Sequence, residues 1–426
     1  MNDFYLKPQL ITALKGYNKG QALKDVIAGV IVAIIALPLS IALALASGVE
    51  PACGIYTAIA AGIVVSLFGG SKVQIAGPTA AFATIVAGIV ATKGMSGLFV
   101  STVLAGILLI IMGVLKLGTF IKYMPHTITI GFTGGIAVTI LFGQIKDFLG
   151  LVYPEGVRPV ETLHKVEENI KAISTFSPWA LLIGAISLAI LIIYPKFEKK
   201  LPPSLLAVVI GAALVKAFPT IDSAVYTIGD LYTIPTGLPQ VDFSGISFGA
   251  DSVVAALPDA ITIALLAAIE SLLSCVVADG MINSKHNPNS ELLAQGLGNI
   301  ASVLFGGIPA TGAIARTSAN IKNGGRTPVA GVVHGLVLSL VLLFLMPYAA
   351  LIPMPTIAAI LFVVAYNMSE WRKFRDIFRK KNLCNILVLI VTFILTVVFD
   401  LVVAIAVGVV LHLVLLLATK LCKKSK

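Results

Sequence analysis

Long runs of apolar residues follow one another along most of this chain, and they constrain its fold more than any other feature. Of the 426 residues, 58% are hydrophobic and only 12% are charged. A typical soluble domain carries about 25% charged residues, so an apolar core inside a water-facing shell is excluded. A helix that crosses a bilayer needs about 20 apolar residues. The sequence therefore predicts an all-α polytopic membrane protein.

Charged residues and Pro or Gly breaks divide the apolar runs into 14 predicted transmembrane segments, arranged as two series of seven. The first series comprises 25–48, 51–69, 75–92, 97–115, 125–143, 177–194 and 202–218. The second comprises 251–279, 290–305, 309–323, 328–347, 349–366, 383–399 and 401–420. The corresponding domains are a cytoplasmic N-terminal segment 1–24, a first repeat 25–218, a non-cytoplasmic connector 219–250, a second repeat 251–420 and a basic cytoplasmic tail 421–426. Within the first repeat, the loop 144–176 is predicted to form an amphipathic surface helix.

The two series share short motifs in the same order. Ala36-Leu37-Pro38 lies in the first segment of one series, and Ala256-Leu257-Pro258 lies in the first segment of the other. Met124-Pro125 stands at the start of the fifth segment of the first series, and Met354-Pro355 lies near the start of the fifth segment of the second. Seven segments per repeat force the second copy to enter the membrane upside down. We therefore expect two inverted repeats.

The distribution of basic residues gives the orientation. If both termini are cytoplasmic, 23 of the 30 Lys and Arg residues fall on the inner side and six on the outer side. Arg316 belongs to neither side. This asymmetry follows the positive-inside rule, and it explains the net charge of +10 without nucleic acid. We expect a multi-pass protein of the plasma (inner) membrane with both termini in the cytoplasm.

Two predicted segments are too short to cross the membrane as helices. The third has 14 residues between Pro78 and Lys93, and the tenth has 14 between Pro309 and Gly324. At about 1.5 Å per residue such helices reach only about 21 Å, so non-helical backbone must complete each crossing inside the protein. In inverted repeats their N-termini converge near the midplane. Because helix N-termini attract anions, the sequence predicts an anion site there; simple kinked spans are the alternative.

Two charged residues inside the apolar series sharpen this prediction. Arg316 lies in the tenth segment, where burying it costs about 3 kcal/mol. We interpret it as the source of positive potential for the anion site; an ion pair with Glu270 or a reach to the interface is the alternative. Glu270, with Ser274 one turn later, is interpreted as a proton or sodium site or as the partner of Arg316. His126 and His334 are interpreted as structural residues near span ends.

Other chemistries find no support in the sequence. There is no nucleophile–base arrangement, Walker loop or metal-ligand spacing, so neither an enzyme nor a cofactor is predicted. The four cysteines are far apart, and three of them (Cys53, Cys275 and Cys384) lie in or beside apolar segments. These three are expected to pack as small apolar residues.

The run Pro309-Ala-Thr-Gly-Ala-Ile-Ala-Arg316, continuing to Gly324-Gly325-Arg326-Thr327-Pro328, resembles the tenth-helix region of the SulP anion transporters, also called solute carrier family 26. Gln74-Ile-Ala-Gly-Pro-Thr79 resembles the third helix of that family, and Ala268–Asp279 resembles its eighth. The resemblance implies a uracil-permease-like fold of 14 spans with core and gate domains, in a homodimer. Members commonly carry a STAS domain after the last span; here we expect a shortened chain or a short member.

The resemblance also implies which residues act on which ion. The anion would be held by Thr79, Ala80 and the backbone N–H groups of Gly312, Ala313, Ile314, Ala315 and Arg316. Animal members often have Ser before the Arg, where this chain has Ala315, so backbone groups would carry more of the binding. Glu270, with Ser274, would bind the coupling ion. The sodium-coupled bicarbonate branch has Asp at that position, so Glu270 favours protons.

The function predicted from these features is secondary active transport of a small anion by alternating access, as a proton- or sodium-coupled symporter or an exchanger. Sulfate, bicarbonate and dicarboxylates all remain candidates, because backbone amides and one Arg recognise charge more than shape. A nucleobase permease on the same fold is an alternative, although the tenth segment offers no carboxylate. An uncoupled anion channel or motor is a second alternative.

Overall fold

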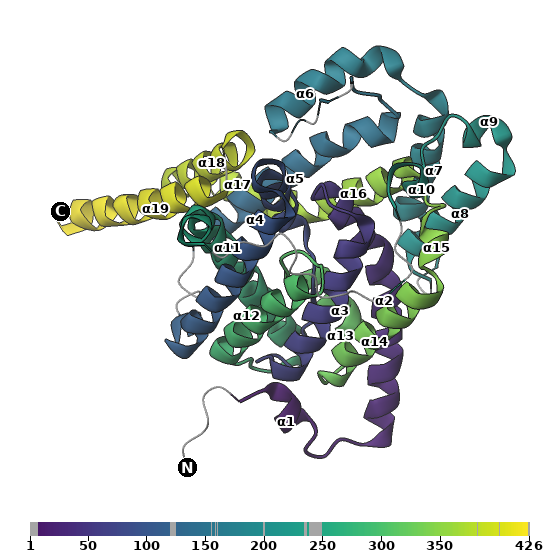
Figure 1. Ribbon diagram of the computed structural model, residues 1–426. Coiled ribbons are helices and arrows are strands. Elements are labelled where there is room, and N and C mark those ends of the chain that lie inside the picture. The colour runs from purple at the N-terminus through teal and green to yellow at the C-terminus, as the bar shows by residue number, and fades with distance from the viewer. Residues whose placement is uncertain are drawn as a thin grey trace.

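The computed structural model describes residues 7–119, 125–154, 156, 157, 159, 161–198, 201–233, 237, 249–380, 382–399 and 401–424. Almost all ordered elements are helices (Figure 1). Those of the first half are α1 Gln9–Ala13, α2 Lys19–Ala46, α3 Pro51–Phe68, α4 Ala80–Val114, α5 His126–Leu149, α6 Thr162–Lys171, α7 Pro178–Phe197, α8 Pro203–Ala217, α9 Pro219–Asp222 and α10 Ile228–Leu231. Those of the second half are α11 Ala250–Ile282, α12 Pro288–Leu304, α13 Ile314–Lys322, α14 Val329–Phe344, α15 Met346–Ala349, α16 Met354–Met368, α17 Trp371–Arg379, α18 Leu383–Val398 and α19 Leu401–Lys424.

Each predicted apolar segment coincides with a helix or part of one. Six described helices, α2, α3, α4, α5, α7 and α11, are long and apolar enough to cross a membrane on their own. Helix α4 contains both the third and fourth predicted segments, joined at Gly94, whose φ of 68° and ψ of −173° are not helical. Such a positive φ favours glycine because a side chain would be strained there. The predicted surface helix in the loop 144–176 is α6, followed by a short 3-10 turn at Ala172–Thr175.

Some predictions fall on positions outside the described residues. These are the start of the N-terminal segment (1–6), most of the second half of the connector (234–236 and 238–248), Arg158 and the last two residues of the basic tail. Within the described part of the predicted connector, α9 and α10 are single helical turns. Helix α2 begins at Lys19, six residues before the predicted first segment.

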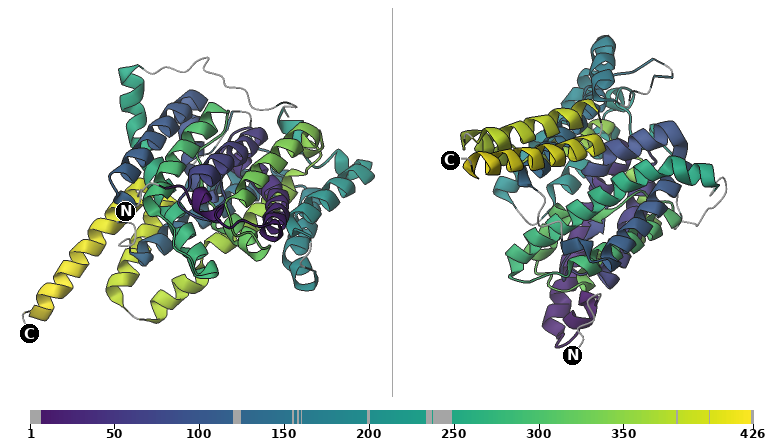
Figure 2. Two further views of the ribbon diagram at one scale, coloured as in Figure 1. Left: turned by 90° about the horizontal axis from the view of Figure 1, so that it is seen from below. Right: turned by 90° about the vertical axis from the view of Figure 1, so that its left-hand side faces the viewer.

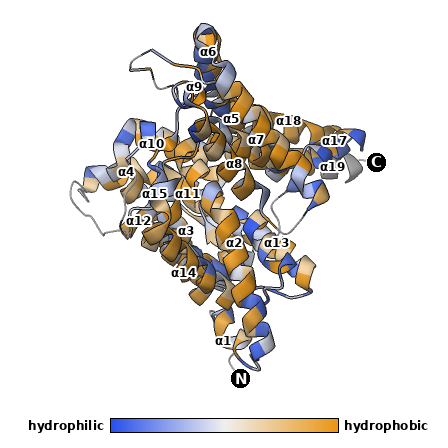
Figure 3. Ribbon diagram, turned by 90° about the vertical axis from the view of Figure 1, so that its right-hand side faces the viewer, coloured by the Kyte–Doolittle hydropathy of each residue, from blue (hydrophilic) through white to orange (hydrophobic). Residues whose placement is uncertain are grey.

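The helices pack in two groups that draw from both halves of the sequence. In one group, α12 lies against α3 and α4, α11 against α4, and α14 against α2 and α3. In the other group, α16 and α18 lie against α5, and α16 also lies against α7. Figures 1 and 2 show α18 and α19 projecting side by side away from the first group. Apolar residues predominate on most of these helices, whereas hydrophilic residues gather toward helix ends and on α17 (Figure 3).

A pair of two-residue strands crosses the middle of the first group. β1 (Ala76–Gly77) precedes α4, and β2 (Thr311–Gly312) precedes α13. They pair antiparallel, with Ala76 opposite Gly312 and Gly77 opposite Thr311. Helix α13 and the part of α4 before the break at Gly94, together called the two short helices below, therefore begin on either side of one crossing. This arrangement satisfies backbone groups that would otherwise be unpaired at membrane depth.

The tenth segment is shorter than predicted. Helix α13 has nine residues and begins at Ile314, whereas the sequence predicted 14 residues ending at 323. The difference arises because α12 and β1 hold the preceding residues extended: Asn299 bonds both the N–H and the carbonyl of Ala310, at 2.9 and 2.8 Å. Backbone that is already paired in this way cannot also form a first helical turn.

Candidate functional site

A cavity of about 340 Å³ lies where the two short helices begin. We call it the Arg316 cavity. Its walls come from α2, α4, α5, α11, α13 and α16, with the residues that precede α4, α13 and α17. They are Leu39, Leu43, Pro78, Thr79, Ala80, Thr133, Glu270, Gly312, Ala313, Ile314, Ala315, Arg316, Val364, Asn367, Met368 and Glu370. Every anion-site residue predicted from the sequence lies on this wall. The backbone N–H groups of Gly312 and Ala313, however, already donate to Ser271 Oγ at 3.0 Å and to the Ile75 carbonyl at 2.9 Å, so they are not free to bind an anion as predicted.

The two helix N-termini at this cavity carry no side-chain cap. The residue that precedes α4 is Thr79, and its side chain does not accept a bond from the first turn. The residue that precedes α13 is Ala313, which has no side-chain acceptor at all. Each first turn thus leaves backbone N–H groups for another acceptor. Two partial positive charges at one cavity favour an anionic ligand.

Arg316 lies next to strand β1. Its side chain is 1% exposed, and its Nη2 donates to Ser40 Oγ at 3.1 Å and to the carbonyl of Pro78 at 3.3 Å. The guanidinium passes so close to Gly77 that a Cβ there would lie 1.9 Å from Nη1. The glycine in the Gly77-Pro78 pair is therefore required for the arginine to reach this position. Arg316 contributes positive charge to the cavity from a fixed place.

Glu270 lies in α11 and also lines the Arg316 cavity. Its carboxylate accepts a hydrogen bond of 2.8 Å from Thr79 Oγ1, at the start of α4. Among the ion pairs of the described residues, Glu270 and Arg316 are not joined to each other, which disfavours a simple structural pair. Ser274 is fully buried and, within the described part of the chain, its hydroxyl has no hydrogen-bond partner. Ser274 does not line the cavity.

Buried polar side chains hold the strands in place. Ser271 Oγ bonds Thr311 Oγ1 at 2.6 Å and accepts from the N–H of Gly312 at 3.0 Å. Thr317 of α13 accepts from the N–H of Ile75 at 3.1 Å, and Asn320 donates to the carbonyl of Val73 at 2.9 Å. These bonds tie strand β2 to α11 and tie the residues just before strand β1 to α13 of the other half of the chain, so the two N-termini are fixed relative to each other.

Glu291 holds the stretch of chain that precedes strand β1. It is fully buried in α12, and its carboxylate accepts from the N–H groups of Gly70 and Ser71 at 2.9 and 3.2 Å. Gln74 and Gln295 donate to its other oxygen at 3.2 and 2.9 Å. The sequence analysis gave Glu291 no role. Its role is to bind backbone donors, which no local pattern reveals.

Sequence reasoning also missed the wall opposite the short helices. Thr133 of α5 and Val364, Asn367 and Met368 of α16 close the Arg316 cavity from the second helix group, and Glu370 lies at its edge. Leu39 and Leu43 of α2 complete it. Apart from Glu370, these residues are apolar or neutral, and nothing distinguishes them from packing positions, because only tertiary structure brings them to the site.

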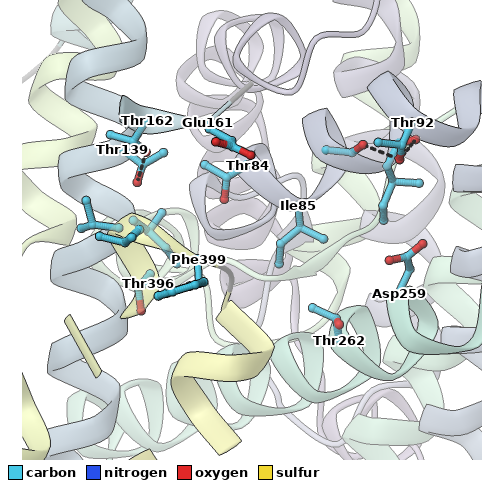
Figure 4. A pocket seen from close by; sticks show the side chains of 15 residues that line it. Thr84, Ile85, Thr92, Thr139, Glu161, Thr162, Asp259, Thr262, Thr396 and Phe399 are labelled. Carbon is cyan, nitrogen blue, oxygen red and sulfur yellow. Dashed lines mark hydrogen bonds between the residues drawn. The ribbon is translucent and has the colours of Figure 1, made fainter. Parts of the chain in front are cut away.

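A second cavity of about 260 Å³ lies between the same two helix groups. We call it the Asp259 cavity (Figure 4). Residues of α4 and α11 face residues of α5 and α18 across it, and Glu161 and Thr162 border it; its labelled lining comprises Thr84, Ile85, Thr92, Thr139, Glu161, Thr162, Asp259, Thr262, Thr396 and Phe399. Lys93 pairs with Asp259 at 2.5 Å beside it.

Comparison with known proteins gives a consistent result. A family model described as the sulfate permease family matches residues 23–392. The putative sulfate transporter YvdB of Bacillus subtilis (strain 168) is 46% identical over 89% of this chain and 70% of its own length. The bicarbonate transporter BicA of a Picosynechococcus strain is 34% identical over 82% of this chain, which spans 62% of that protein.

Solved structures share the fold. The transmembrane domain of a cyanobacterial bicarbonate transporter, BicA, is 30% identical, with a TM-score of 0.77 over 91% of this chain and 98% of that domain. Murine Slc26a9, described as an anion transporter in the inward-facing state, gives a TM-score of 0.86 over 98% of this chain and 72% of its own. At 18% identity, this second likeness concerns the fold alone.

Proposed function

This chain belongs to the sulfate permease family, and from that membership and the geometry of the Arg316 cavity we propose that it transports a small anion across the membrane by alternating access. Its relatives are sulfate and bicarbonate transporters, so membrane anion transport rather than enzyme chemistry is its general activity. The substrate class is sulfate, bicarbonate or a dicarboxylate. The carrier is a secondary active symporter or exchanger.

One observation carries this proposal. The uncapped N-termini of α4 and α13 begin at the same cavity, above a buried Arg316 whose two described hydrogen bonds are to neutral oxygens. An anion between Ala80 and Ala315 would receive backbone N–H groups from both helices and the field of the guanidinium. Because Arg316 is almost wholly buried, it attracts the anion through its charge rather than through bidentate hydrogen bonds. Such a site selects by charge and size.

The two cavities support alternating access. Both lie between the helix group that holds the short helices and the group that contains α5 and α18. The Arg316 cavity reaches Glu370, next to the basic residues of α17, and the positive-inside rule assigns that end to the cytoplasm. The Asp259 cavity lies toward the other end. Rocking of one group against the other would expose the anion site to each side in turn.

We assign the helix groups to the domains expected for this family. The core comprises α2–α4 and α11–α14, and the gate comprises α5, α7, α8, α16, α18 and α19. The antiparallel pairing of β1 with β2 supports two inverted repeats of seven segments. We place the protein in the plasma (inner) membrane as a homodimer, with both termini in the cytoplasm.

The transport proposal is tested by counterflow of labelled anions into liposomes that contain the purified protein. We expect sulfate, bicarbonate or a dicarboxylate to accumulate transiently in exchange for the same anion inside. Arg316→Ala should abolish or strongly reduce this uptake. Asp251→Asn, which changes an exposed charge at the start of α11 and lines neither cavity, is the control and should retain it. Equal uptake by wild type and Arg316→Ala would remove Arg316 from the mechanism, and uptake of uracil or xanthine instead would support a nucleobase permease.

We propose that Glu270 binds the coupling ion, a proton or sodium. Its carboxylate is bonded to Thr79 beside the predicted anion position, so occupancy of one site affects the other. Glu270→Gln keeps the shape and removes the ionisable group. We expect the variant to exchange anions but to lose acceleration by an inward proton or sodium gradient. A variant that responds to both gradients as the wild type does would show that Glu270 is not the coupling residue.

A further inference from the structure

His334 lies in the second turn of α14. It is fully buried against α3, where a Cβ at Gly62 would lie 3.4 Å from His334 Nδ1 and 3.4 Å from the carbonyl oxygen of Ala76. One turn earlier in α14, Gly331 lies directly against Ser66 of α3. The imidazole is thus enclosed between α14 and α3, near the Ala76 carbonyl of strand β1.

Four buried nitrogen atoms in this region have no hydrogen-bond partner among the described residues. They are Nδ1 and Nε2 of His334, and Nε and Nη1 of Arg316. Buried polar side chains are nearly always bonded, so these atoms need partners other than the described residues. Both residues lie around β1: Nη1 of Arg316 lies against Gly77, and the imidazole lies near the Ala76 carbonyl.

We propose that ordered water joins His334 to Arg316 behind the anion cavity, and that His334 is thereby a positioning residue for the guanidinium. A guanidinium only donates, whereas a neutral imidazole has one donor and one acceptor. A water molecule between the two residues accepts from Arg316 Nη1 and donates to the acceptor nitrogen of His334 or to the Ala76 carbonyl. This gives it the two to four polar partners that a buried water needs.

The water-mediated bond between His334 and Arg316 affects anion binding. The Nη2 atom of Arg316 is held by Ser40 and Pro78, so a second tether through Nη1 fixes the plane of the guanidinium. Without it the group can turn about its remaining bonds and its charge moves relative to the N-termini of α4 and α13. The inference rests on the proposed transport function for its effect on anions, but not for the presence of water.

The first test compares His334→Leu and His334→Gln. Leucine fills the space without polar atoms, whereas glutamine keeps one donor and one acceptor. We expect His334→Leu to change thermal stability little, because leucine fills the same buried space with apolar atoms, and to raise the anion KM about tenfold, the factor for one hydrogen bond to a charged group. His334→Gln should stay close to the wild-type KM. Leu338→Met, one turn later and equally buried, is the control and should leave KM unchanged.

A stable His334→Leu variant with wild-type KM would overturn the proposal and make His334 a core residue only. The second test uses the unmodified protein, so it does not depend on variant folding or on transport. Hydroxyl radicals generated by brief X-ray exposure label side chains beside bound water even when they are buried. We expect His334 to be labelled in H₂¹⁸O, with the half-exposed His164 as reference. Labelling of His164 without His334 would contradict a water site, whatever the transport assays show.

Discussion

The substitution Gly77→Ala tests whether the position of Arg316 determines function. The new methyl group would lie 1.9 Å from Arg316 Nη1, where ordinary contacts begin at 3.4 Å. The guanidinium must therefore move by about 1.5 Å, or the strand must shift by the same amount. Arg316 is buried, and its bonds of 3.1 Å to Ser40 and 3.3 Å to Pro78 do not tolerate such a movement.

The expected magnitude follows from those bonds. A hydrogen bond to a charged group is worth about 2 kcal/mol, and about 1.4 kcal/mol is a factor of ten. Loss of one bond and misplacement of the charge should lower kcat/KM for anion uptake by about 10- to 100-fold. Overpacking should also cost about 1–3 kcal/mol of stability, seen as a lower Tm.

The assay is labelled-anion uptake, normalised to folded protein, with Tm measured in the same preparation. Gly280→Ala is the matched control, since a Cβ there meets nothing within 4 Å. It should leave transport unchanged and stabilise α11 by up to about 1 kcal/mol. If Gly77→Ala retains wild-type kcat/KM and Tm, then Arg316 is not held against this strand and the reasoning is refuted.

Two further predictions concern the supports of the site. Asn299→Leu should destabilise the protein by about 2–4 kcal/mol, because the buried N–H and carbonyl of Ala310 lose their partners. An unchanged Tm would show that the bonds between Asn299 and Ala310 do not stabilise the protein. The Lys93–Asp259 pair is partly exposed, so a double-mutant cycle with Lys93→Gln and Asp259→Asn should give a coupling of only about 0–1 kcal/mol; a coupling well above that would show a buried, functional pair.

Much of the architecture was predictable because the bilayer imposes a simple rule. Apolar length predicted the helix positions, and the shortness of two segments predicted that their N-termini lie beside one cavity. The structure brings Thr79, Ala80, Glu270 and residues 312–316 together at that cavity. Their roles in binding remain predictions. Ser274, predicted with Glu270, lies outside the cavity wall.

The remainder depended on contacts between distant residues. Whether 310–313 are helical or extended is decided by Asn299 in α12 and by pairing with β1, and neither is visible in a local pattern. Asn367 and Thr133 enter the site from helices whose sequences look like ordinary packing surfaces. His334 has no partner among the described residues, although a buried histidine is normally expected to have one.

The central claim is that one anion lies between the N-termini of α4 and α13. The most direct measurement places a single cysteine at Ala80 or at Ala315, after replacement of the four native cysteines, and follows the rate of thiol modification while the transported anion is titrated. We predict that the anion protects both positions with the same half-maximal concentration, because a single bound ion touches both helices. Protection of only one position, or of neither at concentrations that saturate transport, would contradict the claim.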